Sequence, residues 1–157
     1  MEVRRNSRVL AVQAIFQYFF SEQDINNIIE EFCKYRIVGK KKCDKDFFCS
    51  LVRGVCKNED SIKESIKNCL SKKWMISRID TTMLAIISLG IYELAYCESV
   101  PLKVVINEYV SIASLFCSDS NTGFINASLD SLAKTLRNKD VVNGWNSINR
   151  KIFITID

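Results

Sequence analysis

The sequence predicts an all-α fold, and three observations lead to that prediction. The 157 residues include only 5 glycines and 1 proline, few for a protein whose strands are joined by tight turns. Apolar residues make up 48% and charged residues 25%, which is typical of a globular protein that buries its own core. Apolar residues also recur every three or four positions along most of the chain, which is the period of an amphipathic helix.

Four helices are predicted in the first half of the chain. The first covers residues 8–20, and Asp24 is a suitable N-cap for the second. Asp44 or Asp46 could open the third, whose apolar stripe is the most regular in the protein. The fourth begins at about Glu59.

Three more helices are predicted in the second half. Residues 79–96 are apolar on nearly every face, so this helix belongs at the centre of a bundle. Pro101 suits the first turn of a sixth helix. The polar residues 118–123 predict a loop, and the seventh helix then covers residues 124–137.

This arrangement predicts a seven-helix bundle made of two packed helical subdomains. With four helices before Trp74 and three after it, the halves are expected at about residues 1–73 and 74–137. Residues 138–157 form a C-terminal tail of unknown role. Its last seven residues alternate like a strand and could equally form an irregular arm.

The chain contains no histidine, which argues against most enzyme mechanisms. Ser-His-Asp and Cys-His nucleophiles are excluded, and so are imidazole metal ligands. Paired carboxylates or lysine could still catalyse a reaction, and Glu108 with Asp130 is such a pair. Hydrogen bonding between helices is the preferred interpretation of these two residues, because no nucleophile, metal ligand or phosphate loop lies nearby in the sequence. We therefore predict no catalytic residue and no enzyme.

The seven cysteines are odd in number and never stand in a Cys-x-x-Cys spacing. Neither a zinc site nor a disulfide framework is expected, and the cysteines are interpreted as small core or boundary hydrophobes. We predict no metal and no cofactor. The charged amino terminus and the absence of a long apolar run favour a cytoplasmic protein in a reducing compartment.

Arg4, Arg5 and Arg8 concentrate positive charge at the start of the first helix. Arginine binds phosphate through a two-pronged contact and stacks on bases, so this cluster is a candidate RNA-contacting surface. A merely solvated basic terminus is the alternative. Lys40–Lys42 form a second basic run, but acidic residues flank it and predict a solvated loop.

Phe124 directly follows the predicted loop. A buried position in the core is one interpretation of this aromatic residue. The other is an exposed ring on which an unpaired base stacks, a contact that contributes about 1–3 kcal/mol.

Several motifs stand together in an order and spacing that resemble those of the NusB family, over about residues 4–137. The most specific stretch runs from Tyr92 to Asp130, and it is the combination of motifs that carries the resemblance. The motifs are Arg4-Arg5-Asn6-Ser7-Arg8, Ala11-Val12-Gln13-Ala14-Ile15-Phe16, Asp46-Phe47-Phe48, Leu51-Val52, Gly54-Val55, Trp74, Arg78-Ile79-Asp80, Tyr92-Glu93-Leu94, Pro101, Val104-Val105-Ile106-Asn107-Glu108, and Phe124-Ile125-Asn126 with Leu129-Asp130.

The resemblance implies a NusB-type bundle and a role in transcription antitermination. A protein of this family pairs with NusE, a small-subunit ribosomal protein, and the pair binds the boxA element of nascent ribosomal RNA transcripts. The complex joins the elongating RNA polymerase and promotes read-through of terminators. Arg4, Arg5 and Arg8 match the family's RNA-contacting start, and Phe124 matches an aromatic near the RNA. Phe16 matches a position, usually tyrosine, that faces NusE.

The sequence departs from the family pattern at several positions. Phe16 lacks the tyrosine hydroxyl, so a hydrogen bond to NusE there must be replaced or lost. Ser88 stands where arginine is common, and Ala127 where the pattern has glycine. Residues 118–123 lack a basic residue that some members carry.

The alternative function is a helical protein–protein adaptor, which could be a homodimer, without specific RNA binding. If the three arginines and Phe124 lie on one continuous surface, the RNA-binding function is favoured over the protein adaptor. An RNA methyltransferase with a NusB-like domain is disfavoured, because there is no glycine-rich cofactor loop and no length for a catalytic domain. We expect Arg5→Ala combined with Arg8→Ala to weaken RNA binding without unfolding the helices.

Overall fold

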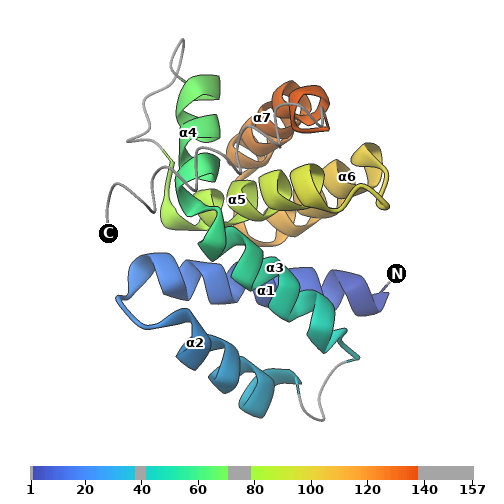
Figure 1. The fold of residues 1–157 in the computed structure, drawn as a ribbon. Helices are drawn as coiled ribbons and strands as arrows, with labels where there is room; N and C mark the ends of the chain where they lie inside the picture. The colour runs from blue at the N-terminus through green and yellow to red at the C-terminus, as the bar shows by residue number, and fades with distance from the viewer. Residues whose placement is uncertain (1, 38–41, 71–78, 138–157) are drawn as a thin grey trace.

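The computed structural model describes residues 2–37, 42–70 and 79–137. Within these ranges the backbone is almost entirely helical and contains no strand (Figure 1), which confirms the predicted all-α fold. None of the described helices is both long enough and apolar enough to cross a membrane. The elements are α1 (Glu2–Phe20), α2 (Ile25–Phe32), a short π-helical segment η1 (Cys33–Ile37), α3 (Lys45–Lys57), α4 (Glu59–Leu70), α5 (Thr81–Tyr96), α6 (Leu102–Phe116) and α7 (Asp119–Leu136).

Side-chain caps start several of these helices. The carboxylates of Asp24, Asp44 and Asp80 accept hydrogen bonds from the backbone N–H groups of the first turns of α2, α3 and α5. Each cap satisfies a donor that would otherwise lack a partner in the helix. The predicted cap at Asp24 is confirmed, and Asp44 rather than Asp46 opens the third helix. Helix α1 begins at Glu2, earlier than predicted, so all three arginines lie on the helix itself.

The prediction of a loop at residues 118–123 is wrong. Helix α7 begins at Asp119, and the Ser118 hydroxyl caps it by accepting a hydrogen bond from the backbone N–H of Asn121 at 3.2 Å. Phe124 consequently lies within the second turn of a helix and does not follow a loop.

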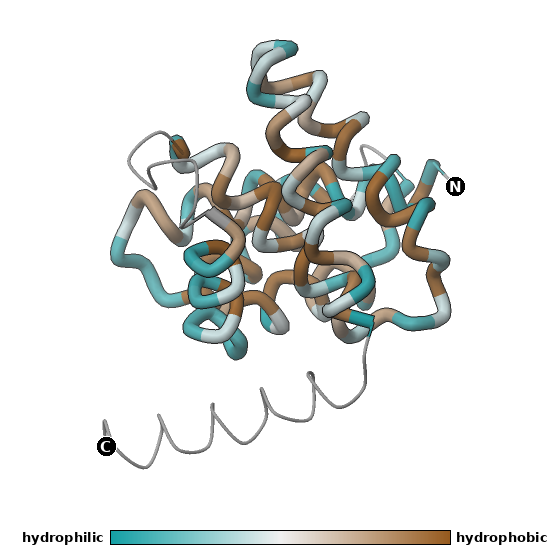
Figure 2. Tube along the Cα trace, turned by 90° about the horizontal axis from the view of Figure 1, so that it is seen from above, coloured by the Kyte–Doolittle hydropathy of each residue, from teal (hydrophilic) through white to brown (hydrophobic). Residues whose placement is uncertain are grey.

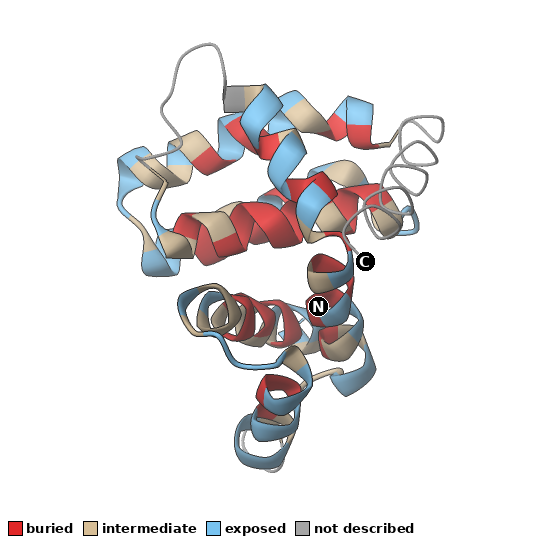
Figure 3. Cartoon of the chain, turned by 60° about the vertical axis from the view of Figure 1, so that its left-hand side comes forward, coloured by how far each residue is buried: buried red, intermediate tan, exposed pale blue. Residues whose placement is uncertain are grey.

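Helix α5 is the centre of the fold, as its apolar sequence predicted. Most of its 16 residues are buried. In Figure 3 the red of buried residues covers most of this helix. It packs against α1, α3, α4, α6 and α7. Among the described residues, the apolar ones lie mainly toward the interior, and hydrophilic residues lie on the outer turns (Figure 2).

The helices form two groups. Helices α1, α2 and α3 pack together on one side, and α5, α6 and α7 form the other, joined chiefly by contacts of α1 and α3 with α5 (Figure 1). Helix α4 packs against α5 and α7, so its contacts place it with the second group. The predicted boundary at residues 73 and 74 falls outside the described residues, as does the predicted tail at 138–157.

A close contact between Gly54 and Tyr92 joins α3 to α5. A Cβ atom on Gly54 would lie 2.1 Å from Cζ of the Tyr92 ring, closer than atoms can approach. The aromatic ring therefore occupies the space that any larger residue at position 54 would need. One turn further along each helix, the Tyr96 hydroxyl donates a hydrogen bond to the Asn58 side chain at 3.1 Å.

Candidate functional site

Helix α1 carries one candidate surface at each end. Its first two turns hold the basic cluster predicted from sequence, and its last turns hold exposed aromatic side chains. The three arginines of the basic cluster have different surroundings in the structure.

Arg4 is exposed and stacks on an aromatic ring. Its guanidinium carbon lies 4.4 Å from the centroid of Phe47, which belongs to α3. Stacking uses the face of the planar guanidinium, whereas its N–H donors lie in the plane. The contact with Phe47 therefore holds Arg4 in place and leaves its donor geometry suited to a phosphate.

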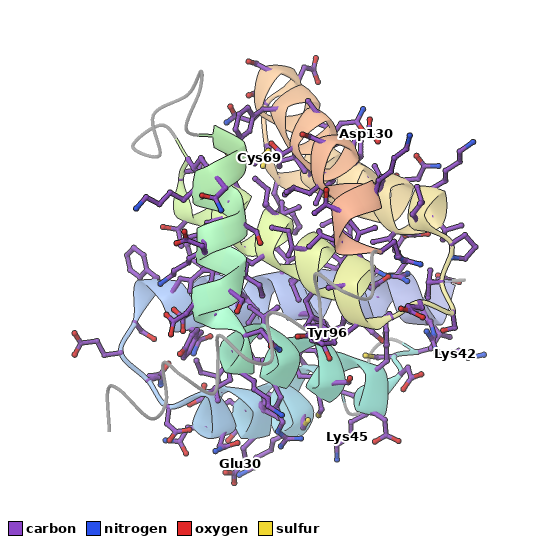
Figure 4. All side chains as sticks on the ribbon, turned by 45° about the horizontal axis from the view of Figure 1, so that its top comes forward. Glu30, Lys42, Lys45, Cys69, Tyr96 and Asp130 are labelled. Atoms are coloured by element: carbon purple, nitrogen blue, oxygen red, sulfur yellow. The ribbon has the colours of Figure 1, made fainter. Side chains whose placement is uncertain are left out.

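Arg5 is half exposed and is paired across the bundle with Glu108 of α6. Its Nε donates to Glu108 Oε2 at 2.8 Å and its Nη2 donates to Oε1 at 3.2 Å. The arginine side chain is 51% exposed and the glutamate 7%. The hydrogen bond and the negative charge of Glu108 raise the pKa of Arg5. The preferred interpretation of Glu108 as a helix-to-helix partner is confirmed, while Asp130 lies exposed on α7 (Figure 4).

Arg8, which the sequence predicts as an RNA contact, is not a surface residue in the structure. It is only 3% exposed. Its Nε and Nη2 donate to the two carboxylate oxygens of Glu93, each at 2.9 Å, and the Tyr109 hydroxyl donates to Glu93 Oε1 at 3.1 Å. Glu93 lies buried on the central helix, and a buried carboxylate requires a cation and hydrogen-bond donors. Arg8 meets that requirement and is withdrawn from solvent.

The buried Arg8–Glu93–Tyr109 cluster shifts two ionisation equilibria. Burial lowers the pKa of Arg8, but the hydrogen bond and charge of Glu93 outweigh burial, so this pKa lies above its ordinary value. Burial and, after it, the Glu93 charge raise the pKa of Tyr109 far above its usual range. The arginine therefore stays charged and the tyrosine stays neutral at any physiological pH.

The start of α1 is also hydrogen-bonded to the residues that precede α3. The Asp44 backbone N–H donates to the Ser7 hydroxyl at 2.8 Å, and the Asn6 side-chain amide donates to the Lys42 carbonyl at 2.9 Å. Lys42 is exposed beside the start of α1 (Figure 4). Lys40 and Lys41 of the predicted lysine run lie outside the described residues.

Phe124 is partly buried and packs against the hydrophobic core. It lies on α7, whose main neighbours are α5 and α6, whereas Arg4 and Arg5 belong to α1. This burial supports the core interpretation of Phe124. A stacking contact between its ring and an RNA base stays a prediction.

The other end of α1 forms one wall of an apolar groove, which we call the aromatic groove. Phe16, Phe20 and Phe116 line it with side chains 36%, 77% and 43% exposed. The rings of Phe16 and Phe20 stack at 5.7 Å between centroids. Exposed aromatic rings gathered in a groove are typical of a protein-binding surface.

Polar groups lie at the aromatic groove beside its apolar lining. The groove has a volume of about 460 Å³, and the buried side chains of Val12 and Phe32 contribute to its lining. Arg36 of η1 donates to the Gln13 side chain at 2.9 Å, and both residues line the groove. An apolar centre with polar neighbours resembles the anatomy of protein interfaces.

Sequence reasoning singled out Phe16, but it did not single out Phe20 and Phe116 of the aromatic groove or Glu93, the buried partner of Arg8. Phe20 stands one helical turn after Phe16, so its spacing could have revealed it. Phe116 is the last residue of α6, and only the packing shows that its side chain is exposed. Glu93 is the one charged residue in α5, a signal that a buried partner must exist.

Comparisons with known proteins agree on one family. A family model described as the NusB family matches residues 5–134. The transcription antitermination protein NusB of Caulobacter vibrioides is 37% identical over 143 residues, covering 87% of this chain and 96% of that protein. The protein of the same name from Maricaulis maris is 36% identical over 141 residues, covering 86% and 88%.

Solved structures share the fold. The structure of T. maritima NusB superposes with a TM-score of 0.74 at 26% identity, covering 89% of this chain and 96% of that one. A structure of antitermination factors NusB and NusE in complex with double-stranded RNA gives a TM-score of 0.75 at 18% identity, covering 86% and 98%. From the extent of the family match and the identity to its members, this chain belongs to the NusB family.

Proposed function

We propose that this protein is a transcription antitermination factor that binds the boxA element of nascent ribosomal RNA transcripts together with NusE. The complex joins the RNA polymerase elongation complex and promotes read-through of terminators. The names of the relatives and their match over nearly their whole length support this role. The observation that carries it is the presence of a basic surface and an aromatic groove at opposite ends of α1.

The spacing of the two surfaces supports binding of two partners at once. Arg5 and Phe16 are eleven residues apart on one helix, which corresponds to about 17 Å along the axis at 1.5 Å per residue. An RNA strand and a protein can therefore occupy the two ends without competing for the same atoms. Each partner adds binding energy to the same complex.

The proposed RNA-binding surface consists of Arg4, Arg5 and Lys42. Arg4 is held by Phe47, and half of the Arg5 side chain faces solvent beyond its pair with Glu108. These charges neutralise phosphates, and the stacked guanidinium suits unpaired bases. Arg8 acts as a positioning residue, because its buried pair with Glu93 fixes the rotation of α1 on α5.

The proposed NusE-binding surface is the aromatic groove around Phe16. NusE would cover Phe16 and Phe20 and remove their rings from water. Burial of these rings supplies most of the affinity. Arg36 and Gln13 offer hydrogen bonds in place of the hydroxyl that Phe16 lacks. An adaptor of this kind catalyses no reaction. To act on nascent transcripts it works in the cytoplasm, beside the RNA polymerase.

RNA binding is tested with a boxA single-stranded RNA and a scrambled control, over a salt series and with NusE present or absent. Arg4→Ala combined with Arg5→Ala should weaken binding at least about tenfold and reduce the slope of log K against log salt by about 0.7 for each phosphate that is no longer neutralised. Lys67→Ala, an exposed lysine on α4, is the matched control and should leave both unchanged. Equal affinity of the double variant and the control would overturn the proposed RNA surface.

NusE binding is tested separately with Phe16→Ala. Removing a ring that a partner buries should weaken binding at least about tenfold, which is about 1.4 kcal/mol. Tyr35→Ala removes an aromatic of 64% exposure outside the groove and should have no effect. If the two variants bind NusE equally well, the aromatic groove is not the NusE surface.

The alternative function is a helical protein–protein adaptor that forms a homodimer without specific RNA binding. The exposed Phe20 and Phe116 favour it, since a second copy could cover them. Analytical ultracentrifugation with and without NusE separates the two proposals. A dimer that NusE does not dissociate, together with equal binding of boxA and scrambled RNA, would favour the alternative.

A further inference from the structure

Arg5 of the proposed RNA-binding surface has its charge matched by a carboxylate. Glu108 Oε2 accepts a hydrogen bond from Arg5 Nε at 2.8 Å, and Oε1 accepts one from Nη2 at 3.2 Å. This two-pronged contact joins α1 to α6. The Glu108 side chain is 7% exposed and that of Arg5 is 51% exposed. The arginine therefore covers the carboxylate and itself faces solvent.

The contact leaves one edge of the Arg5 guanidinium for a ligand. A guanidinium carries five N–H donors in one plane. Glu108 takes the Nε donor and one donor of Nη2, and within the described residues Arg5 makes no other hydrogen bond. Both hydrogens of Nη1 and the second hydrogen of Nη2 remain. They form a second fork, and the planar contact with Glu108 fixes its direction.

Arg4 has different surroundings. Its guanidinium stacks on Phe47, and within the described residues no carboxylate lies at ion-pair distance from it. An aromatic ring leaves the positive charge intact, whereas a carboxylate opposes it. By Coulomb's law, a carboxylate twice as far from a phosphate as the cation removes about half of the attraction. Arg4 therefore suits a phosphate, and the paired Arg5 suits an uncharged group with hydrogen-bond acceptors.

We propose that Glu108 makes Arg5 the residue of this surface that recognises the RNA sequence. Glu108 weakens the attraction of Arg5 for any phosphate and directs the free fork toward the edge of an unpaired base. A base with two neighbouring acceptors, such as O6 and N7 of guanine, matches that fork. Glu108 itself touches no RNA and is a positioning residue. This inference rests on the proposed function, because it concerns the same RNA-binding surface.

The test measures the affinity of the full-length protein for boxA and for scrambled single-stranded RNA, with NusE present and over a salt series. Glu108→Gln keeps the shape and one acceptor but removes the charge. Scrambled RNA should bind about threefold more tightly, with a salt slope that steepens by up to about 0.7, because Arg5 then attracts a phosphate. The ratio of the boxA affinity to the scrambled affinity should fall at least about fivefold.

Glu2→Gln is the matched control. Glu2 is exposed and lies one turn before Arg5 on α1, so this variant loses the same charge beside the same surface. It should raise the affinity for both RNAs alike and leave their ratio unchanged. Equal ratios for the Glu2→Gln and Glu108→Gln variants, whatever their melting temperatures, would show that Glu108 acts only through charge or packing and would overturn the inference.

Arg5→Lys tests the fork without disturbing the buried carboxylate. Lysine keeps the positive charge and can pair with Glu108, but it has no planar fork. The affinity for boxA should fall at least about fivefold, while the affinity for scrambled RNA stays within about twofold. An equal loss for both RNAs would contradict base recognition by Arg5.

The unsubstituted protein separates failure of this inference from failure of the proposed function. If it binds boxA and scrambled RNA equally well, the proposed function fails and the inference fails with it. If it prefers boxA and that preference survives both Glu108→Gln and Arg5→Lys, the inference alone is overturned.

Discussion

At the scale of single residues, the Arg8–Glu93 pair is the most consequential contact. A charge in a protein interior is tolerated when a partner of opposite sign and hydrogen bonds replace the lost water. Arg8 offers two N–H donors to Glu93, and Tyr109 adds a third. The pair fixes α1 on the central helix and so sets where Arg4 and Arg5 face.

Arg8→Ala should therefore destabilise the fold. The substitution leaves Glu93 buried without its cation, at a cost of about 3–5 kcal/mol. Arg4→Ala, which removes an exposed cation–π contact, should cost at most about 1 kcal/mol. Urea unfolding followed by circular dichroism measures both, and equal stability of the two variants would contradict the structural role of Arg8. This destabilisation differs from the expectation, drawn from the sequence alone, that the helices tolerate the substitution.

The position of Arg8 shows what helix spacing reveals about single residues. Arg8 precedes the buried Ala11, Val12 and Ile15 by three, four and seven positions, so it falls on their stripe. Composition alone groups it with Arg4 and Arg5. The spacing could have separated Arg8 from the cluster, but the identity of its partner could not be known before α1 was placed on α5.

Gly54→Ala is a second prediction at this scale. The added Cβ would overlap the Tyr92 ring, so the ring or helix α3 must move, at a cost of about 1–3 kcal/mol. Gly123→Ala is the matched control, because nothing lies within 4 Å of its Cβ position and alanine favours the helix by about 0.5–1 kcal/mol. Thermal unfolding should shift in opposite directions for the two variants; a shift in the same direction would show that the Gly54 contact is not tight.

At the scale of elements, the start of α7 shows how polar residues mislead. Residues 118–123 have the composition of a loop, yet Ser118 is an N-cap and Asp119 is an acidic residue in the first turn. Both favour a helix start, the first by a hydrogen bond and the second by interaction with the helix dipole. The other helices were placed correctly to within a few residues because their apolar periodicity was clear, although α1 extends further toward the amino terminus.

Ser118→Ala should destabilise α7. Losing the hydrogen bond to the Asn121 N–H costs about 1 kcal/mol. Ser120→Ala, an exposed serine inside the first turn, makes no such cap and should change stability by less than about 0.5 kcal/mol. Denaturant midpoints distinguish the two, and identical midpoints would favour the loop that the sequence predicted.

At the scale of the whole molecule, half-buried thiols with raised pKa values predict that the protein is less stable at alkaline pH. Burial, then the charge of Glu59, raises the pKa of Cys56 from 9.0 to about 12, and burial, then Glu93, raises that of Cys97 to about 11. In the unfolded chain these thiols ionise near pH 9, while the folded state keeps their protons. The stability that they contribute is therefore complete below about pH 9 and is lost as the pH rises through about 11 and 12.

The measurement is the free energy of unfolding of the reduced protein at about pH 8 and about pH 10.5. The unsubstituted protein should lose stability between these values. The Cys97→Ser variant lacks one titrating group, so its free energy of unfolding should fall less between the two pH values. A stability that is constant across this interval would show that the thiols ionise equally in both states.

The amino-acid sequence was enough to establish the all-α class, the central place of α5, most helix positions and the family. Those features follow from local periodicity, capping residues and motif order, which are readable along the chain. Two others became known only from the packed structure: Arg8 is buried while Arg4 and Arg5 face solvent, and Phe116 completes the aromatic groove. These features depend on contacts between segments far apart in the sequence, and the packing of helices against one another creates them.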